Sequence, residues 1–77
     1  MNILFKKKKS YEEIVKEKLK AREEARLRHF NRAQECMVEI MKGDKEAYHK
    51  LEYNVSCMNQ YTYEIILLRE ILEEARS

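Results

Sequence analysis

The stretch AYHKLEYNVSCMNQYTYEIILLREILEEA, residues 47–75, decides the fold class of this chain. In this stretch, positions spaced alternately four and three residues apart carry apolar side chains, and Asn54 is the single polar exception. This spacing is typical of the apolar seam along which two helices of a coiled coil pack. It therefore predicts one long helix with a seam formed by Ala47, Leu51, Asn54, Met58, Tyr61, Ile65, Leu68, Leu72 and Ala75.

The preceding part of the chain repeats the same spacing. Ser10 and Glu13 fit a capping box at the start of a first helix. Gly43 is the single glycine of the chain and suits the left-handed position that ends a helix, and Asp44 can cap the helix that follows. The seam of this first helix is expected to run through Val15, Leu19, Arg22, Arg26, His29, Ala33, Cys36 and Ile40.

Together the two seams predict an all-α fold, an antiparallel two-helix hairpin resembling a coiled coil. We expect helices over about residues 10–42 and 44–76, joined by a turn at 42–44. Folding the chain back at that turn pairs residues whose numbers sum to about 87, so that Leu19 meets Leu68. The two seams then agree in register, which supports the hairpin.

Composition limits the chain to a single small domain. Its 77 residues are 39% charged, contain no proline and carry a net charge of +2. Residues 6–9 contribute +4, residues 10–42 contribute +1 and residues 43–77 contribute −3. The pI of about 8.5 is below the value of about 9 expected of a dedicated nucleic-acid-binding domain. We expect residues 1–9 to form a flexible basic tail that precedes the hairpin.

The second helix carries more apolar surface than one seam uses. Residues 63–72 are apolar nearly all round, and Leu67 and Ile71 point away from the seam. A helix that is apolar on several faces is usually covered on several faces. We therefore expect two hairpins to pair into a dimeric four-helix bundle, or one hairpin to dock on a partner. The expected self-association or partner interface consists of Tyr48, Tyr53, Val55, Tyr61, Tyr63, Ile66, Leu67 and Ile71.

Cationic side chains interrupt the seam of the first helix. They could recognise a carboxylate, a phosphate or an acidic partner. Alternatively, the arginine stems cover the apolar seam, the heads reach water or Glu64, and Arg26 lies on Tyr61 in a cation–π pair. Asn54 is expected to fix the register of the seam. The cationic candidates are Lys6, Lys7, Lys8 and Lys9 of the tail, with Arg22, Arg26 and His29.

No constellation in the sequence favours catalysis or metal binding. Cys36, Cys57, His29 and His49 form neither a CxxC nor an HExxH spacing, and one glycine cannot build a phosphate-binding loop. No cysteine has a base and an orienting group at a recognisable spacing. We expect no enzyme activity, no metal and no cofactor. The sequence shows no signal peptide or membrane span, and we expect a cytoplasmic location.

The sequence therefore favours a non-enzymatic protein-interaction module that binds a larger protein, as adaptors, inhibitors and small phage- or plasmid-type regulators do. We expect it to be a homodimer. The alternative is binding to nucleic acid or to an anionic membrane through the N-terminal lysines and the arginines of the first helix. Glutamates are interleaved with Arg22, Arg26, Arg28 and Arg32, so no continuous basic stripe is expected.

Overall fold

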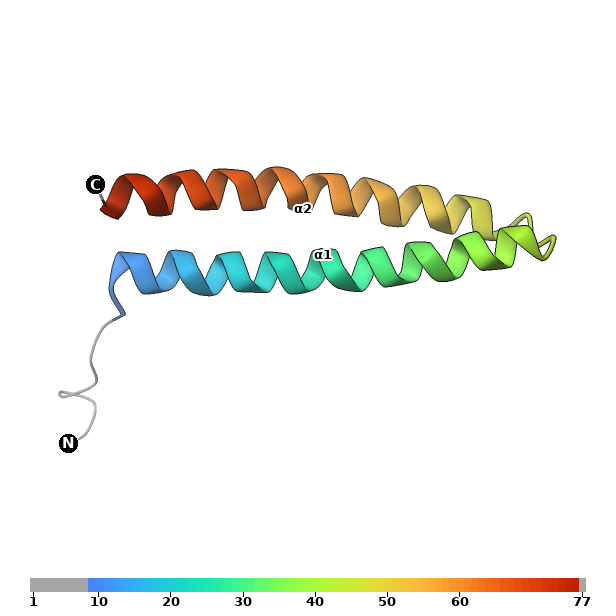
Figure 1. Cartoon of the computed structure of the whole chain (residues 1–77), viewed down its shortest axis with the longest axis horizontal. Coiled ribbons are helices and arrows are strands. Elements are labelled where there is room, and N and C mark those ends of the chain that lie inside the picture. The colour runs from blue at the N-terminus through green and yellow to red at the C-terminus, as the bar shows by residue number, and fades with distance from the viewer. Residues whose placement is uncertain (1–8, 77) are drawn as a thin grey trace, which may run out of the picture.

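The protein is an antiparallel pair of long helices that lie side by side (Figure 1). The computed structural model describes residues 9–76. Helix α1 spans Tyr11–Met41 and helix α2 spans Ala47–Arg76, and the two pack against each other along their length. No strand occurs in this described part of the chain. The predicted all-helical hairpin is confirmed.

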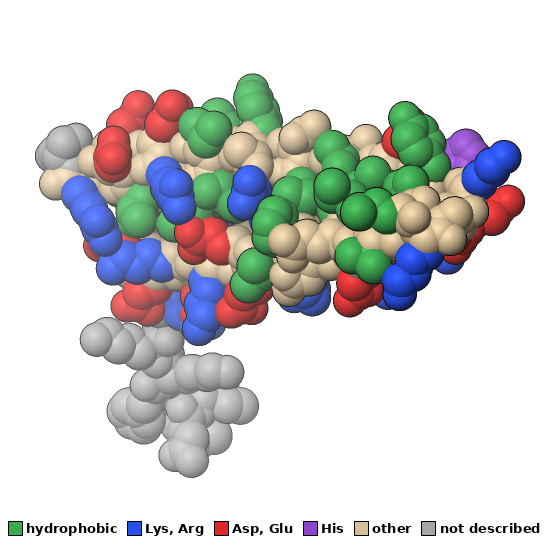
Figure 2. Space-filling model, turned by 45° about the vertical axis from the view of Figure 1, so that its right-hand side comes forward, with side chains coloured by type: hydrophobic (Ala, Val, Ile, Leu, Met, Phe, Trp, Pro, Cys, Tyr) green, Lys and Arg blue, Asp and Glu red, His purple; other side chains and the backbone are tan. Residues whose placement is uncertain are grey.

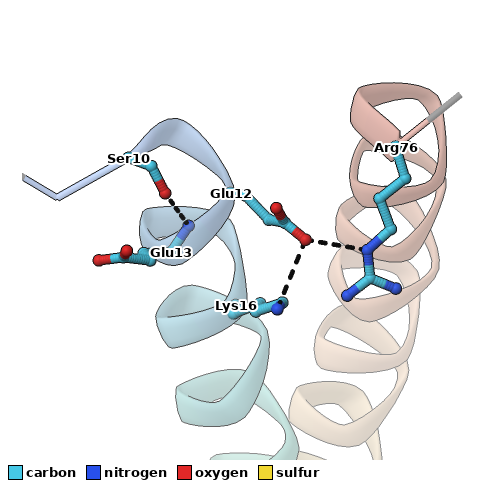
Figure 3. Close-up of polar contacts among 5 residues, drawn as sticks. All are labelled: Ser10, Glu12, Glu13, Lys16 and Arg76. Carbon is cyan, nitrogen blue, oxygen red and sulfur yellow. Dashed lines mark hydrogen bonds and ion pairs between the residues drawn. The ribbon is translucent and has the colours of Figure 1, made fainter.

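Local capping explains where α1 begins. The Oγ atom of Ser10 accepts a hydrogen bond of 3.1 Å from the backbone N–H of Glu13, and Ser10 itself has extended backbone angles (Figure 3). This bond satisfies one of the free N–H groups at a helix start. Glu12 and Glu13 place negative charge in the first turn, where it opposes the positive end of the helix dipole.

A left-handed glycine closes the other end of α1. The N–H of Gly43 donates to the carbonyl of Ile40 (2.9 Å), and the N–H of Asp44 donates to that of Glu39 (3.0 Å). This pair of bonds is the Schellman arrangement, and Gly43 has the φ of +101° that it requires. An L side chain at this φ would be strained even though nothing lies within 4 Å of the place a Cβ would take.

The turn continues past Gly43 before α2 begins. Asp44 accepts a 3.0 Å bond from the N–H of Glu46 through its Oδ1, and its carbonyl accepts a 3.3 Å bond from the N–H of Ala47. These bonds hold residues 44–47 in a tight turn, so regular α-helix starts at Ala47 rather than at about residue 44. Asp44 thus caps this turn, in keeping with the affinity of aspartate for such positions.

The core is a thin stripe between the two helices. Seven apolar residues and Asn54 are buried, and no large side chain is fully enclosed. Ala25 is buried in α1, whereas Arg26, which the spacing placed in the seam, is exposed. A small side chain lets the helices approach at this level, and the charged head of an arginine stays in water. The buried apolar residues are Val15, Ala25, Ala33, Cys36, Ala47, Ile65 and Leu72.

One of two ion pairs across the seam agrees with the expected register. Arg22 pairs with Glu64 (Nε to Oε1, 3.2 Å), and their numbers sum to 86, close to the expected 87. Arg69 reaches more than one turn beyond its expected partner to pair with Glu23 (2.9 Å), and these numbers sum to 92. All of these side chains are at least 32% exposed. Exposed pairs of this kind contribute about 0–1 kcal/mol each. They therefore align the helices more than they stabilise them.

Glu12 at the open end of the hairpin gives a pH-dependent stability. It accepts a 2.9 Å hydrogen bond from Arg76 and lies 3.4 Å from the Nζ of Lys16 (Figure 3). The hydrogen bond from Arg76, helped by the charge of Lys16, lowers the pKa of Glu12 below its ordinary value of 4.5. A carboxyl whose pKa is lower in the folded state stabilises the fold at pH values above its unfolded-state pKa. This stabilisation is lost as the pH falls through its folded-state pKa.

We therefore expect Glu12→Gln to lower the free energy of unfolding at pH 7 and to lower it less at pH 2, because protonation of Glu12 removes this contribution as the pH falls. Urea denaturation followed by circular dichroism at both pH values measures this. Glu24→Gln is the matched control, because no interaction of Glu24 is found in the described part of the chain. An equal loss at both pH values would contradict the role of this ion pair.

Candidate functional site

Hydrophobic side chains gather on one face of the hairpin, over both helices and toward the turn end (Figure 2). The ion pair between Glu23 and Arg69 joins α1 to α2 and marks one side of the hairpin. Phe30 and Met37 follow Glu23 at intervals of seven residues, and Val55 and Tyr48 precede Arg69 at fourteen and twenty-one. Intervals of seven return to the same side of a helix, so these residues share the face of the ion pair.

Three more exposed hydrophobic residues lie one helical turn from residues of this face. Leu27 and Met41 follow Glu23 and Met37 by four residues, and Ile66 precedes Arg69 by three. Ile66 and Arg69 also line one shallow hollow together with Arg26 and Thr62. We call the whole set the apolar face. It comprises Leu27, Phe30, Met37, Met41, Tyr48, Val55 and Ile66, with exposed fractions between 41% and 85%.

The opposite side of the hairpin carries a basic groove near the turn. Its volume is about 490 Å³, and no acidic residue lines it. Arg28 and Arg32 lie one turn apart on α1, and Lys50 comes from α2. We call this site the basic groove. Its lining consists of Arg28, His29, Arg32, His49, Lys50, Tyr53 and Asn54.

A polar and aromatic network forms the floor of the basic groove. The Nδ1 of His29 lies 2.7 Å from the Oδ1 of Asn54, and the amide nitrogen of Asn54 donates to the carbonyl of Lys50 (2.8 Å). The ring of His29 stacks on Tyr61 at 5.7 Å and meets the edge of Tyr53 at 6.1 Å. Asn54 is buried, and a buried amide needs these partners to offset its desolvation. The network therefore holds the His29 ring in one orientation.

The structure separates the cationic residues that the sequence grouped together. Arg22 turns to Glu64, as the alternative interpretation anticipated, and Arg26 donates to the Oγ1 of Thr62 at 2.6 Å. In the described part of the chain Arg26 thus bonds to Thr62 and Tyr61 stacks on His29, and no cation–π pair of Arg26 with Tyr61 is seen. Only His29 of the three lines the basic groove.

The residues expected to form one interface are divided among five places. Tyr48, Val55 and Ile66 lie on the apolar face. Leu67 and Ile71 line a hollow on the opposite side with Lys18, and Tyr53 borders the basic groove. Tyr61 is half-buried in the seam, and Tyr63 is 66% exposed on the outer side of α2.

Among the described residues, Lys9 and the two cysteines add no further site. Lys6, Lys7 and Lys8 lie outside the described residues, and Lys9 pairs with Glu17 at 2.6 Å. Cys36 and Cys57 are free thiols, and the thiol of Cys57 beside Tyr53 raises the pKa of that phenol. No group of three or more histidine, cysteine or acidic residues able to hold a metal ion occurs among residues 9–76.

Sequence reasoning missed Arg28, Arg32, Lys50 and His49 as groove residues. Residue spacing and the hairpin register could have predicted the groove. Arg28 and Arg32 share one side of α1, and the register brings Lys50 and Tyr53 to that side. The groove was missed because glutamates alternate with these arginines along α1, and no continuous basic stripe was therefore expected. Of the glutamates interleaved with the arginines, Glu23 pairs with Arg69 nearer the open end and Glu35 makes an exposed contact of 3.6 Å with Arg32.

No protein-family model, curated protein or solved structure matches this chain. Within the described residues, neither helix has a stretch long and apolar enough to cross a membrane.

Proposed function

We propose that this protein is a non-enzymatic interaction module that pairs as a homodimer and acts by binding a larger protein, as an adaptor, an inhibitor or a small regulator does. The observation that carries this proposal is the apolar face, where seven large hydrophobic side chains are 41–85% exposed on one side of the hairpin. Contiguous exposed apolar surface on a small protein marks an interaction site.

The energy available from this face is sufficient for pairing. Full burial of one large side chain contributes about 1.5–3 kcal/mol, so seven that are half exposed offer roughly 5–10 kcal/mol per chain. Two copies that cover each other gain about twice that amount. Association costs about 4–15 kcal/mol in lost freedom. The middle values of these ranges leave a surplus of about 5.5 kcal/mol, which corresponds to a dissociation constant of about 0.1 mM.

The position of the apolar face favours one arrangement of the dimer. Its residues occupy the middle and the turn end of the hairpin, whereas Arg69 and Arg76 lie nearer the open end. Two copies bury this surface on each other when both turns point the same way, which gives a four-helix bundle. The net charge of +2 per chain adds little repulsion.

Such a dimer leaves the opposite side of each hairpin accessible to a larger protein. Leu67 and Ile71 are 41% and 37% exposed there, in a hollow bordered by Lys18. We propose that the protein works in the cytoplasm, where reducing conditions keep Cys36 and Cys57 as thiols.

Sedimentation of the full chain tests the homodimer. At about 100 µM we expect an average mass clearly above the 9.4 kDa of one chain, falling toward that value on dilution, as the energy balance requires. A monomer at that concentration would contradict the pairing. For the larger partner, we expect affinity capture from the source cells, with identification by mass spectrometry, to yield one specific protein. The Leu67→Asp variant should no longer capture this protein, whereas the Tyr63→Asp variant should still capture it.

A further inference from the structure

The basic groove is a local concentration of positive charge on a chain that is nearly neutral overall. Arg28 and Lys50 form no ion pair among the described residues, and Arg32 has only an exposed contact of 3.6 Å with Glu35. Unpaired cations on both walls of one groove repel each other. An anion between them would remove this repulsion and engage donors that now face solvent.

An aromatic side chain lies beside these cations. Tyr53 is 65% exposed, so most of its side chain is open to a ligand, and its ring meets that of His29 in a T-shaped contact with centroids 6.1 Å apart. The groove volume of about 490 Å³ is within the usual range of roughly 300–1,000 Å³ for sites that take small molecules. Cations next to an exposed ring are the combination with which proteins hold the phosphates and bases of unpaired nucleotides.

We propose that the basic groove binds a nucleotide, with Arg28, Arg32 and Lys50 contacting the phosphate and the ring of Tyr53 stacking on the base. Two arginines one turn apart supply forked donors suited to phosphate oxygens, and the lysine supplies a third charge from the facing helix. The ligand is a free nucleotide or one unit of a single strand, since both present the same chemistry.

A lipid surface fits this groove less well. Most of the exposed aliphatic side chains lie on the apolar face or around Leu67 and Ile71, Ile14 and Val38 lie elsewhere on α1, and none of them lines the groove. A bilayer would therefore gain charge contacts here without hydrophobic insertion. The groove and the apolar face lie on opposite sides, so nucleotide binding does not depend on the proposed dimer.

Binding measurements on the full chain test the proposal with three probes. These are AMP, a fluorescein-labelled ten-nucleotide uridine strand, and vesicles of phosphatidylcholine with phosphatidylserine. The double variant Arg28→Gln with Lys50→Gln removes two groove charges. Lys16→Gln with Lys20→Gln removes the same charge from the first half of α1 and is the matched control. Circular dichroism establishes that each variant keeps its helices.

We expect the groove variant to bind AMP or the strand about 10-fold more weakly or worse, and the control to change binding less than 3-fold. For the strand, the dependence of binding on salt should also become shallower, by about 1–2 units of slope. Tyr53→Leu should weaken strand binding by about 5-fold or more. Tyr63→Leu should not, although Tyr63 is exposed to the same extent, 66% against 65%.

Each outcome has a defined meaning. Groove-dependent binding of AMP identifies a nucleotide site, and groove-dependent binding of the strand alone identifies a single-strand site; both support the proposal. Equal losses in the groove and control variants would overturn it, because binding would then reflect total charge. Groove-dependent binding to vesicles without binding to AMP or the strand would assign the groove to membranes and would also overturn it. No binding of any probe would do the same.

Discussion

Met37→Glu combined with Val55→Glu is expected to convert the dimer into a monomer. Both residues lie near the centre of the apolar face, with exposed fractions of 53% and 41%. In a symmetric dimer this substitution places four carboxylates in one apolar interface, and burying unpaired charges costs several kcal/mol. We therefore expect the dissociation constant to rise by at least about 100-fold, which corresponds to about 2.7 kcal/mol. Sedimentation equilibrium over a range of protein concentrations measures it.

The control for this experiment adds the same charge elsewhere. Val38 and Tyr63 are exposed hydrophobic residues on the outer sides of α1 and α2, at 49% and 66%. Val38→Glu with Tyr63→Glu should leave the dimer unchanged. If both double variants dissociate alike, the cause is total charge and the apolar face is not the dimer interface. Helix content, followed by circular dichroism, must remain similar in the two variants for the comparison to count.

Two adjacent isoleucines should respond differently to the same substitution. Ile65 is buried in the seam at 6% exposure, and Ile66 is 50% exposed on the apolar face. Ile65→Ala removes methylene groups from a thin core, and the cavity adds to the lost burial. We expect the free energy of unfolding to fall by about 2–4 kcal/mol, a large part of the stability of so small a domain.

Ile66→Ala should instead act through association. The loss should be small when dilute monomer is unfolded and should grow with protein concentration, because pairing stabilises the folded chain by mass action. Urea denaturation of both variants at about 2 µM and about 200 µM separates these effects, since the two concentrations lie on either side of a dissociation constant of about 0.1 mM. Identical behaviour of the two variants would mean either that the hairpin does not pair through this face or that Ile65 is not a seam residue.

The helices and the turn could be predicted because their causes are local. Ser10 caps α1, Gly43 ends it, and spacings of four and three residues carry the seam of α2. The start of α2 at Ala47 was less accessible, because hydrogen bonds around Asp44 decide how long the turn continues. The burial of Ala25 in place of Arg26 required the actual distance between the helices, since both lie close enough to the seam to compete for it.

The candidate sites could be predicted only in part. The periodicity of the sequence predicted an excess of apolar residues on α2, and three of the residues predicted to form an interface lie on the apolar face: Tyr48, Val55 and Ile66. Leu27, Phe30, Met37 and Met41 were not assigned to it, because an exposed residue on α1 becomes part of a patch only through what lies beside it on α2. The same reason hid the basic groove, whose walls come from Arg28 and Arg32 on one helix and Lys50 on the other.

The sequence by itself determined the two helices, their caps, their antiparallel order and the approximate register, because each follows from neighbours along the chain or from a repeat of three and four residues. The tertiary structure alone decided which side chains meet across the hairpin. Tyr61 stacks on His29, Asn54 bonds to His29, and Arg26 reaches Thr62. Side-chain partners depend on the rotation and separation of two helices, and a shift of one or two ångströms exchanges one partner for another.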